Sequence, residues 1–206
     1  MKLLIVSATH EEISLSIPTL EKLNIPYIIT GVGMTATAYS LGKELGKYQA
    51  DLALNVGIAG SFDRSIPLGQ IVQVQSDHFY ELGAEDGKKF ISIEDLGFGH
   101  SKYSRTFDNY DIHLPSYDGI TVNRVHGDDE SIQMVKKSYP NVQIESMEGA
   151  AFFYACQQEN MPCTQIRCIS NYVERRNRNN WKIPLAIKNL NDWLINFVNN
   201  SKNFKI

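Results

Sequence analysis

The sequence predicts an α/β domain in which helices cover both faces of a largely parallel sheet. Short segments of strand length alternate with longer segments that have helical periodicity, which is the pattern expected of such a fold. Polar and glycine-rich segments come where predicted strands end, at the sheet edge where these folds bind ligands. These segments are residues 9–12, 31–33, 57–60 and 127–129, together with Asn171.

Six predicted strands account for the short apolar segments. Each segment has the length and the apolar residues of a buried strand, and polar or turn-forming residues bound it. In chain order they are residues 3–8, 27–30, 52–56, 71–75, 120–126 and 164–170. Residues 77–118 are rich in Gly, Asp, Tyr and Ser, so we expect a loop-rich excursion there with one or two short strands.

Four predicted helices lie between and after these strands. The first covers residues 35–47, the second presents Ile132 and Val135 on one face, and the third covers residues 150–158. The last helix has the clearest pattern, with Pro184 near its start and apolar residues at i, i+3, i+4, i+7 and i+8. Those apolar residues are Leu190, Trp193, Leu194, Phe197 and Val198.

Length, charge and cysteine content exclude several classes of protein. With 206 residues the chain fits one domain, residues 1–206. The net charge of -3 argues against a nucleic-acid or anionic-membrane partner, and no apolar run approaches the ~18 residues of a membrane span. The cysteines, Cys156, Cys163 and Cys168, are expected to be buried reduced thiols, so we expect a cytoplasmic protein.

The glycine-rich segments and the histidines do not predict a cofactor or a metal. Residues 31–33 and 57–60 lack the third glycine and the acidic partner of a dinucleotide-binding fingerprint. The five histidines include no His-x-x-x-His pair. We therefore expect neither a nicotinamide or flavin cofactor nor a metal ion.

Three charged residues require a more specific explanation. Glu12 follows the first strand, where it fits either a general base or the acidic first turn of a helix. Glu148 opens a predicted helix, and a carboxylate at that position is usually structural. Arg167 lies inside a predicted strand, where a buried arginine must be paired, and Glu12 is the natural partner.

Four segments together resemble the nucleoside phosphorylase/nucleosidase family over residues 1 to about 194. The strongest match is SMEGAA at residues 146–151, which is similar to the Met-Glu signature before an alanine-rich helix in that family. The others are THEE at residues 9–12, NVGIAG at residues 55–60 and RCISN at residues 167–171. The resemblance implies a three-layer αβα fold whose twisted, mostly parallel sheet is mixed and partly barrel-like.

The resemblance also implies a role for each matching residue. Glu12 would activate water, Arg167 would order Glu12 and the water, and Glu148 would bind the ribose hydroxyls beside Met147. Asn171 would face the base. The other residues that the resemblance places around the substrate are Ser146, Ala59, Gly60, Trp181 and Phe107. Phe107 would cover the site of a neighbouring subunit, so we expect a homodimer or a higher homo-oligomer.

The resemblance favours hydrolysis of a 6-oxopurine nucleoside. The first arginine is Arg64 and residues 31–37 carry no basic side chain, although a phosphate site favours arginine. The adenine-specific branch carries Asp where this chain has Asn171, and an amide suits O6 and N7–H of hypoxanthine better than adenine. The segment from Asn171 to Trp181 is similar to the branch that hydrolyses futalosine in menaquinone biosynthesis, releasing hypoxanthine.

Other functions stay open on the sequence alone. Arg175, Arg176 and Arg178 fit either a contact with a substrate carboxylate or a solvated basic loop. The rival enzymes are a methylthioadenosine/S-adenosylhomocysteine nucleosidase, which Asn171 disfavours, and a purine nucleoside phosphorylase. A binding protein on the same fold is the non-enzymatic alternative, because a fold does not fix a function.

Overall fold

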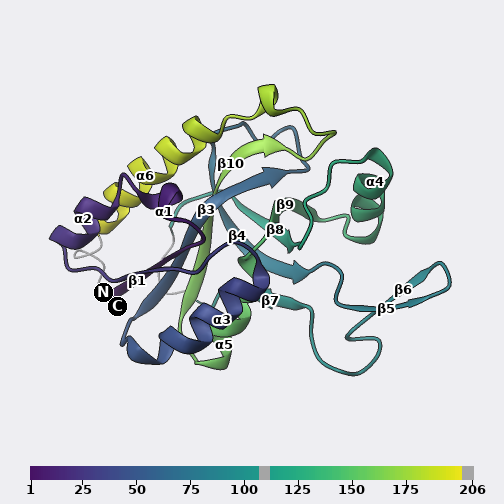
Figure 1. Ribbon diagram of the computed structural model, residues 1–206, viewed down its shortest axis with the longest axis horizontal. Helices are drawn as coiled ribbons and strands as arrows, with labels where there is room; N and C mark the ends of the chain where they lie inside the picture. Colours follow the sequence, from purple (N-terminus) through teal and green to yellow (C-terminus); the bar gives the residue numbers. More distant parts are fainter. Residues whose placement is uncertain (107–111, 201–206) are drawn as a thin grey trace.

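The computed structural model describes residues 1–106 and 112–200 and contains one large mixed sheet with a small hairpin (Figure 1). The sheet runs in the order β10-β4-β8-β9-β3-β1-β2, and β7 pairs with β4. Its strands are β1 (Leu3–Ser7), β2 (Tyr27–Ile29), β3 (Leu52–Ser61), β4 (Ile71–Phe79), β7 (Lys102–Ser104), β8 (Ser116–Thr121), β9 (Val142–Ser146) and β10 (Cys163–Tyr172). The hairpin consists of β5 (Gly83–Asp86) and β6 (Lys89–Ser92).

The large sheet closes on itself through β3 and β10. These two strands pair in parallel over almost their whole lengths, although they stand apart in the linear strand order. The closure makes a ring of five strands, β3-β10-β4-β8-β9, from which β1 and β2 extend as an open parallel wing. The β10–β4 and β3–β9 pairs are antiparallel, so the sheet is mixed and partly barrel-like.

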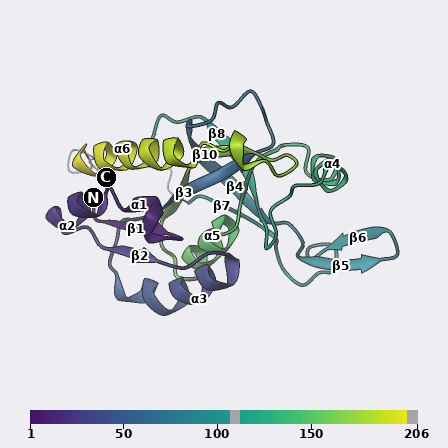
Figure 2. The same cartoon turned by 45° about the horizontal axis from the view of Figure 1, so that its top comes forward.

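Helices cover the two faces of this sheet (Figures 1 and 2). One layer contains α1 (His10–Ile13), α2 (Ile17–Lys22) and α6 (Ile183–Asn200), whose apolar residues pack with Leu54 and Ile166. The other layer contains α3 (Met34–Glu44), followed by the 3-10 helix η1 (Leu45–Lys47), and α5 (Gly149–Gln158). Their residues Leu41 and Phe152 share a second core with Val74.

The remaining elements lie at one end of the molecule. The helix α4 (Asp129–Ser138) packs Ile132 and Val135 against the β8 residue Ile120, and the β5–β6 hairpin projects beyond it (Figure 1). The 3-10 helix η2 (Arg178–Asn180) lies between β10 and α6. Within the described ranges, none of the helices has the length and apolarity needed to span a membrane.

The observed strands differ from the predicted ones in the middle of the chain. β3 does not stop at Gly57 but continues to Ser61, and β4 continues to Phe79. The predicted strand at residues 120–126 is observed earlier, as β8 (Ser116–Thr121), and β9 was not predicted. The buried polar residues of β9, Glu145 and Ser146, hide its strand character from a hydrophobicity pattern.

Candidate active site

Glu12 is fixed by contacts with two strands of the sheet. Thr9 caps α1, and its backbone N–H donates to Glu12 Oε2 at 3.2 Å while its hydroxyl accepts from the Glu12 N–H, which completes a capping box. Ser7 donates to the same Oε2 at 3.1 Å, and the Ile58 N–H donates to Oε1 at 3.0 Å. Glu12 is therefore both a helix-capping residue and a carboxylate held at the sheet edge.

Gly57 separates Glu12 from Arg167. Arg167 pairs with Gly57 across β10 and β3, and it is only 1 % exposed. A Cβ atom at Gly57 would lie 2.8 Å from Glu12 Oε1 and 2.9 Å from Arg167 Nη1, which is closer than Cβ atoms approach in proteins. The absence of a side chain at this position allows both charged groups to reach the same face of the strand.

The expected direct ion pair between Arg167 and Glu12 is not observed, and that prediction was wrong. Nη1 of Arg167 donates weakly to the Ile166 carbonyl at 3.4 Å, while Nε and Nη2 have no hydrogen-bond partner among the described residues. The prediction failed because backbone amides already occupy the Glu12 carboxylate, whereas Arg167 acts on several carboxylates at longer range. Two buried donors of Arg167 consequently remain available to a ligand or to water.

Glu148 joins Glu12 and Arg167 from the turn between β9 and α5. It is 9 % exposed, and its Oε1 accepts the Gly33 N–H at 2.9 Å. Burial raises the pKa of Glu148, the Arg167 charge and the Gly33 hydrogen bond lower it, and the Glu12 charge raises it. Burial lowers the pKa of Arg167, which Glu148 and Glu12 oppose. We call these three residues, Glu12, Glu148 and Arg167, the carboxylate cluster.

Asp77 lies behind the carboxylate cluster and was not identified from the sequence. Its carboxyl oxygens accept hydrogen bonds from Thr121 at 2.8 Å and from Gln165 at 3.1 Å. Thr121 in turn accepts the Ala150 N–H at 2.7 Å in the first turn of α5, directly after Glu148. Burial raises the pKa of Asp77 to about 7, against these hydrogen bonds and the Arg167 charge. Asp77 therefore supports the turn that carries Glu148.

Asn171 and Trp181 line a separate cavity of about 160 Å³, which we call the Asn171 pocket. The Asn171 amide lies beside Gly60, where a Cβ atom would come within 3.3 Å of Nδ2. Ser170 donates to Asn171 Oδ1 at 2.8 Å, and Nδ2 donates to the Tyr172 carbonyl at 3.1 Å. Each amide atom keeps further hydrogen-bonding capacity. The lining of this pocket includes Gly60, His126, Glu145, Asn171, Arg176 and Trp181.

His126 and Glu145 form a buried pair in the Asn171 pocket that sequence analysis missed. Their side chains are 9 % and 3 % exposed, and Nδ1 of His126 contacts Glu145 Oε2. The His126 N–H also donates to both Glu145 oxygens at 3.2 Å. A distance of 19 residues separates the two in the sequence, so no local pattern links them.

Three segments join the carboxylate cluster to the Asn171 pocket. On β3, Gly57 adjoins the cluster and Gly60 lines the pocket. On β10, Arg167 belongs to the cluster and Asn171 lines the pocket, with a β-bulge between them. In the β9–α5 segment, Glu145 lines the pocket and Glu148 belongs to the cluster. Three residues of a strand span roughly 10 Å, so the two regions lie side by side.

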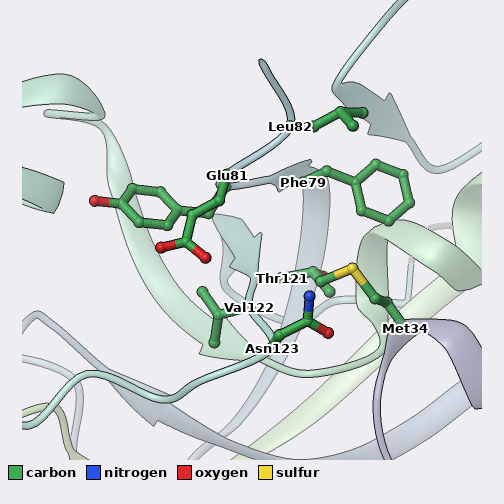
Figure 3. A pocket seen from close by; sticks show the side chains of 8 residues that line it. Met34, Phe79, Glu81, Leu82, Thr121, Val122 and Asn123 are labelled. Atoms are coloured by element: carbon green, nitrogen blue, oxygen red, sulfur yellow. The ribbon is translucent and has the colours of Figure 1, made fainter. Parts of the chain in front are cut away.

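A second cavity, of about 140 Å³, is lined by residues of α3, β4 and β8 (Figure 3). Met34 lines it directly after Gly33, whose N–H donates to Glu148, and Thr121 lines it while accepting the Ala150 N–H in the turn after Glu148. The side chains of Phe79, Leu82 and Val122 make it largely apolar (Figure 3). This cavity therefore offers an apolar surface next to the carboxylate cluster.

The other predicted site residues lie around these regions. Ser146 is buried and accepts the Gly149 N–H at 3.2 Å, while Met147 is half-buried beside Glu148. Ala59 is buried, and its carbonyl accepts the Ser170 hydroxyl. Arg176 lies over the Trp181 ring at 5.2 Å. Phe107, the remaining predicted site residue, lies outside the described residues.

Comparison with known proteins identifies the family. The family model of the phosphorylase superfamily matches residues 6–199. The chain belongs to the phosphorylase superfamily. Among the described residues of this superfamily member, no group of three or more His, Cys, Asp or Glu side chains is arranged to hold a metal ion.

Two kinds of nucleosidase are among the relatives of this chain. The chain is 30% identical to futalosine hydrolase of Acidothermus cellulolyticus over 175 residues, which are 79% of this chain and 70% of the relative. It is 24% identical to 5'-methylthioadenosine/S-adenosylhomocysteine nucleosidase of Psychromonas ingrahamii, over 83% of this chain and 79% of the relative. The solved structure of 5'-methylthioadenosine/S-adenosyl homocysteine nucleosidase from Helicobacter pylori with butyl-thio-DADMe-Immucillin-A has a TM-score of 0.81 at 14% identity and covers 97% of this chain and 98% of its own. This likeness confirms the predicted fold.

Proposed function

We propose that this chain is a nucleosidase that uses water to cleave the N-glycosidic bond of futalosine and release hypoxanthine. The observation that carries the proposal is the position of the carboxylate cluster beside the Asn171 pocket, with three chain segments shared between them. The cluster supplies charges suited to the ribose, and the pocket supplies an amide suited to the base. The sequence similarity to futalosine hydrolases supports the same substrate.

Water is the nucleophile in this proposal, and Glu12 is its general base. Glycoside cleavage develops positive charge on the sugar and negative charge on the departing base. Glu12 accepts a proton from the water as oxygen attacks C1′, and the free donors of Arg167 hold the water or the ribose. Glu148 accepts hydrogen bonds from the ribose hydroxyls, and these bonds strengthen as the sugar becomes cationic. Each charge-assisted bond contributes about 1.5–3 kcal/mol.

The contact between Gly33 and Glu148 favours hydrolysis over phosphorolysis. A phosphate ion would use the amides at the start of α3, because helix N-termini bind anions. The N–H of Gly33, the N-cap residue of α3, already donates to Glu148 Oε1. No arginine precedes Arg64 in the chain, so the loop before α3 also lacks a cation for phosphate.

Asn171 selects a 6-oxopurine in this proposal. Its remaining N–H donates to O6, and its carbonyl oxygen accepts from N7–H after the departing base takes a proton from solvent at N7. Methylthioadenosine/S-adenosylhomocysteine hydrolysis is the second candidate, favoured by the sequence similarity to that nucleosidase. An amide has no proton to give adenine, so the 6-oxopurine substrate fits better.

A base-release assay tests the function directly. The purified chain is incubated with futalosine, inosine or methylthioadenosine, with and without inorganic phosphate, and free base and sugar products are quantified. We expect hypoxanthine from futalosine at a rate that phosphate does not change, with a free ribose hydroxyl at C1′. Faster cleavage of methylthioadenosine would assign the second candidate, and a ribose 1-phosphate product would assign a phosphorylase.

A further inference from the structure

The His126–Glu145 pair occupies the Asn171 pocket without an assigned role. Both side chains are more than nine-tenths buried, and burying an ionisable pair is costly unless its contacts repay the cost. Glu145 receives hydrogen bonds from the His126 N–H to both of its oxygens, in addition to the contact with Nδ1. The carboxylate therefore fixes the position and the rotation of the imidazole ring.

The His126–Glu145 pair and Asn171 lie on opposite sides of Gly60, which has no side chain. Glu145 pairs with Gly60 across β9 and β3, and Gly60 pairs with Asn171 across β3 and β10. Neighbouring strands lie about 4.8 Å apart, so Asn171 and Glu145 are separated by roughly 10 Å with only a glycine between them. A flat bicyclic base fits over Gly60 and reaches both sides.

The second nitrogen of His126 is available to such a base. Nε2 has no hydrogen-bond partner in the part of the chain that the structure describes, whereas Nδ1 is held by Glu145. Phe62 and Tyr80 pack against the ring, with centroid distances of 6.2 Å and 5.1 Å, and restrict its movement. The other charged groups lining the pocket already have partners, because Glu174 pairs with Arg64 and Arg176 stacks on Trp181.

We propose that His126, held by Glu145, is a second base-recognition residue that donates its Nε2–H to O6 of the leaving purine. This inference rests on the proposed function. As the C1′–N9 bond breaks, its electron pair passes into the purine and increases the negative charge on O6. The Nε2–H···O6 bond strengthens at that moment and needs no proton transfer. The 6-amino group of adenine would place its own N–H donors against the Nε2–H of His126, so the His126–Glu145 pair discriminates against adenine. Glu145 is a positioning residue.

Two substitutions of His126 separate its two nitrogens. The amide nitrogen of Asn reaches the place of Nδ1, so His126→Asn keeps a donor to Glu145 but has nothing at Nε2. The amide nitrogen of Gln reaches the place of Nε2, so His126→Gln keeps the donor to the base. Glu145→Gln keeps the volume of the side chain but removes the carboxylate that contacts Nδ1 of the imidazole. His78→Asn is the control, because His78 is half-buried against Tyr139, outside the pocket.

The experiment measures kcat and KM for futalosine and for its 6-amino counterpart with each protein, together with thermal melting. For His126→Asn we expect kcat/KM on futalosine to fall about 10²-fold, the effect of losing one donor to a developing oxyanion. On the 6-amino counterpart we expect less than a threefold change, so the 6-oxo preference collapses. His126→Gln should retain most of the preference, and Glu145→Gln should lower kcat on futalosine more than it changes KM.

Equal losses on both substrates, or an unchanged preference in His126→Asn, would overturn the inference. If His126→Asn fails to fold, His126→Gln decides, because a loss of preference equal to that of Glu145→Gln would contradict a role for Nε2. The wild-type chain tests the proposed function separately. Failure of the wild-type protein to cleave either nucleoside rejects that function, whereas the variants bear only on His126.

Discussion

The carboxylate cluster and the Asn171 pocket differ in how their polar groups are satisfied. In the cluster, backbone N–H groups of Thr9, Ile58 and Gly33 supply most of the hydrogen bonds to the carboxylates, while Arg167 keeps two free donors. In the pocket, side chains also hold one another, as in the Ser170–Asn171 and His126–Glu145 contacts. Backbone contacts survive most substitutions and side-chain contacts do not. The cluster is therefore suited to chemistry common to nucleosides, and the pocket to choosing the base.

The largest effect is expected for Glu12→Gln, which tests whether the cluster carries the chemistry. An amide keeps the acceptor for the Ile58 N–H but cannot take a proton from water. We expect kcat to fall about 10³-fold with little change in KM, within the range for general bases. Steady-state hypoxanthine release measures the effect. Glu11→Gln is the control, because Glu11 is an exposed neighbour, and similar losses in both variants would reject Glu12 as the base.

Gly57→Ala tests how closely the two charges of the cluster must approach. The new Cβ would lie 2.8 Å from Glu12 Oε1 and must displace Glu12 or Arg167. We expect kcat/KM to fall about 10²-fold, the usual cost of a misplacement of about 1 Å. Gly42→Ala is the matched control, because no atom lies within 4 Å of its Cβ and alanine favours the helix by about 1 kcal/mol. Full activity of Gly57→Ala would show that the cluster tolerates separation.

Asn171→Asp tests whether the pocket selects the base. A carboxyl group can protonate an adenine leaving group, whereas a carboxylate repels O6 of hypoxanthine. We expect kcat/KM for futalosine to fall about tenfold and that for methylthioadenosine to rise. Competition between the two nucleosides gives the ratio in one reaction. Asn177→Asp, in the exposed loop before η2, should change neither value. An unchanged ratio in Asn171→Asp would move base selection elsewhere.

The smallest expected effect is on the pH dependence of the free energy of unfolding, to which Asp77 contributes. Burial raises the pKa of Asp77 to about 7 from 3.8, so the folded state favours the protonated form. The stability that this proton gives is complete below pH 3.8 and is lost as the pH rises through 7. Asp77→Asn mimics the protonated group and removes this loss.

The measurement is urea unfolding of both proteins at pH 5 and pH 8. Relative to wild type, we expect Asp77→Asn to gain on the order of 2–3 kcal/mol of stability between these pH values. Asp192→Asn is the control, since Asp192 is exposed on α6 and pairs with Lys188. Parallel pH dependence in wild type and Asp77→Asn would show that Asp77 is ionised in the folded protein.

Local patterns were sufficient for the elements that bury a regular apolar face. The i, i+3, i+4 spacing in α6 and the apolar run of β1 predicted both elements correctly. The capping signal at Thr9 and Glu12 is also local, and the structure contains it. By contrast, β9 escaped prediction because buried Glu145 and Ser146 interrupt its apolar pattern.

Contacts between distant segments could not be predicted from spacing. The closure of the ring depends on β3–β10 pairing, which periodicity cannot specify. Asp77 and Gln165 meet across 88 residues, and His126 meets Glu145 across 19. The rule that buried charges pair failed for Arg167, because it describes direct contacts and the compensation here acts at longer range.

The ring of strands has a consequence for how the protein acquires its activity. β10 is the last strand among the described residues, and it pairs with both β3 and β4 while carrying Arg167 and Asn171. Before β10 has left the ribosome, a nascent chain lacks both of these residues at the site, and its ring of strands is still open. Pairing between such distant segments is slow compared with local helix formation. We therefore expect catalytic activity to begin late in folding on the ribosome, only after β10 has paired and the ring of strands has closed.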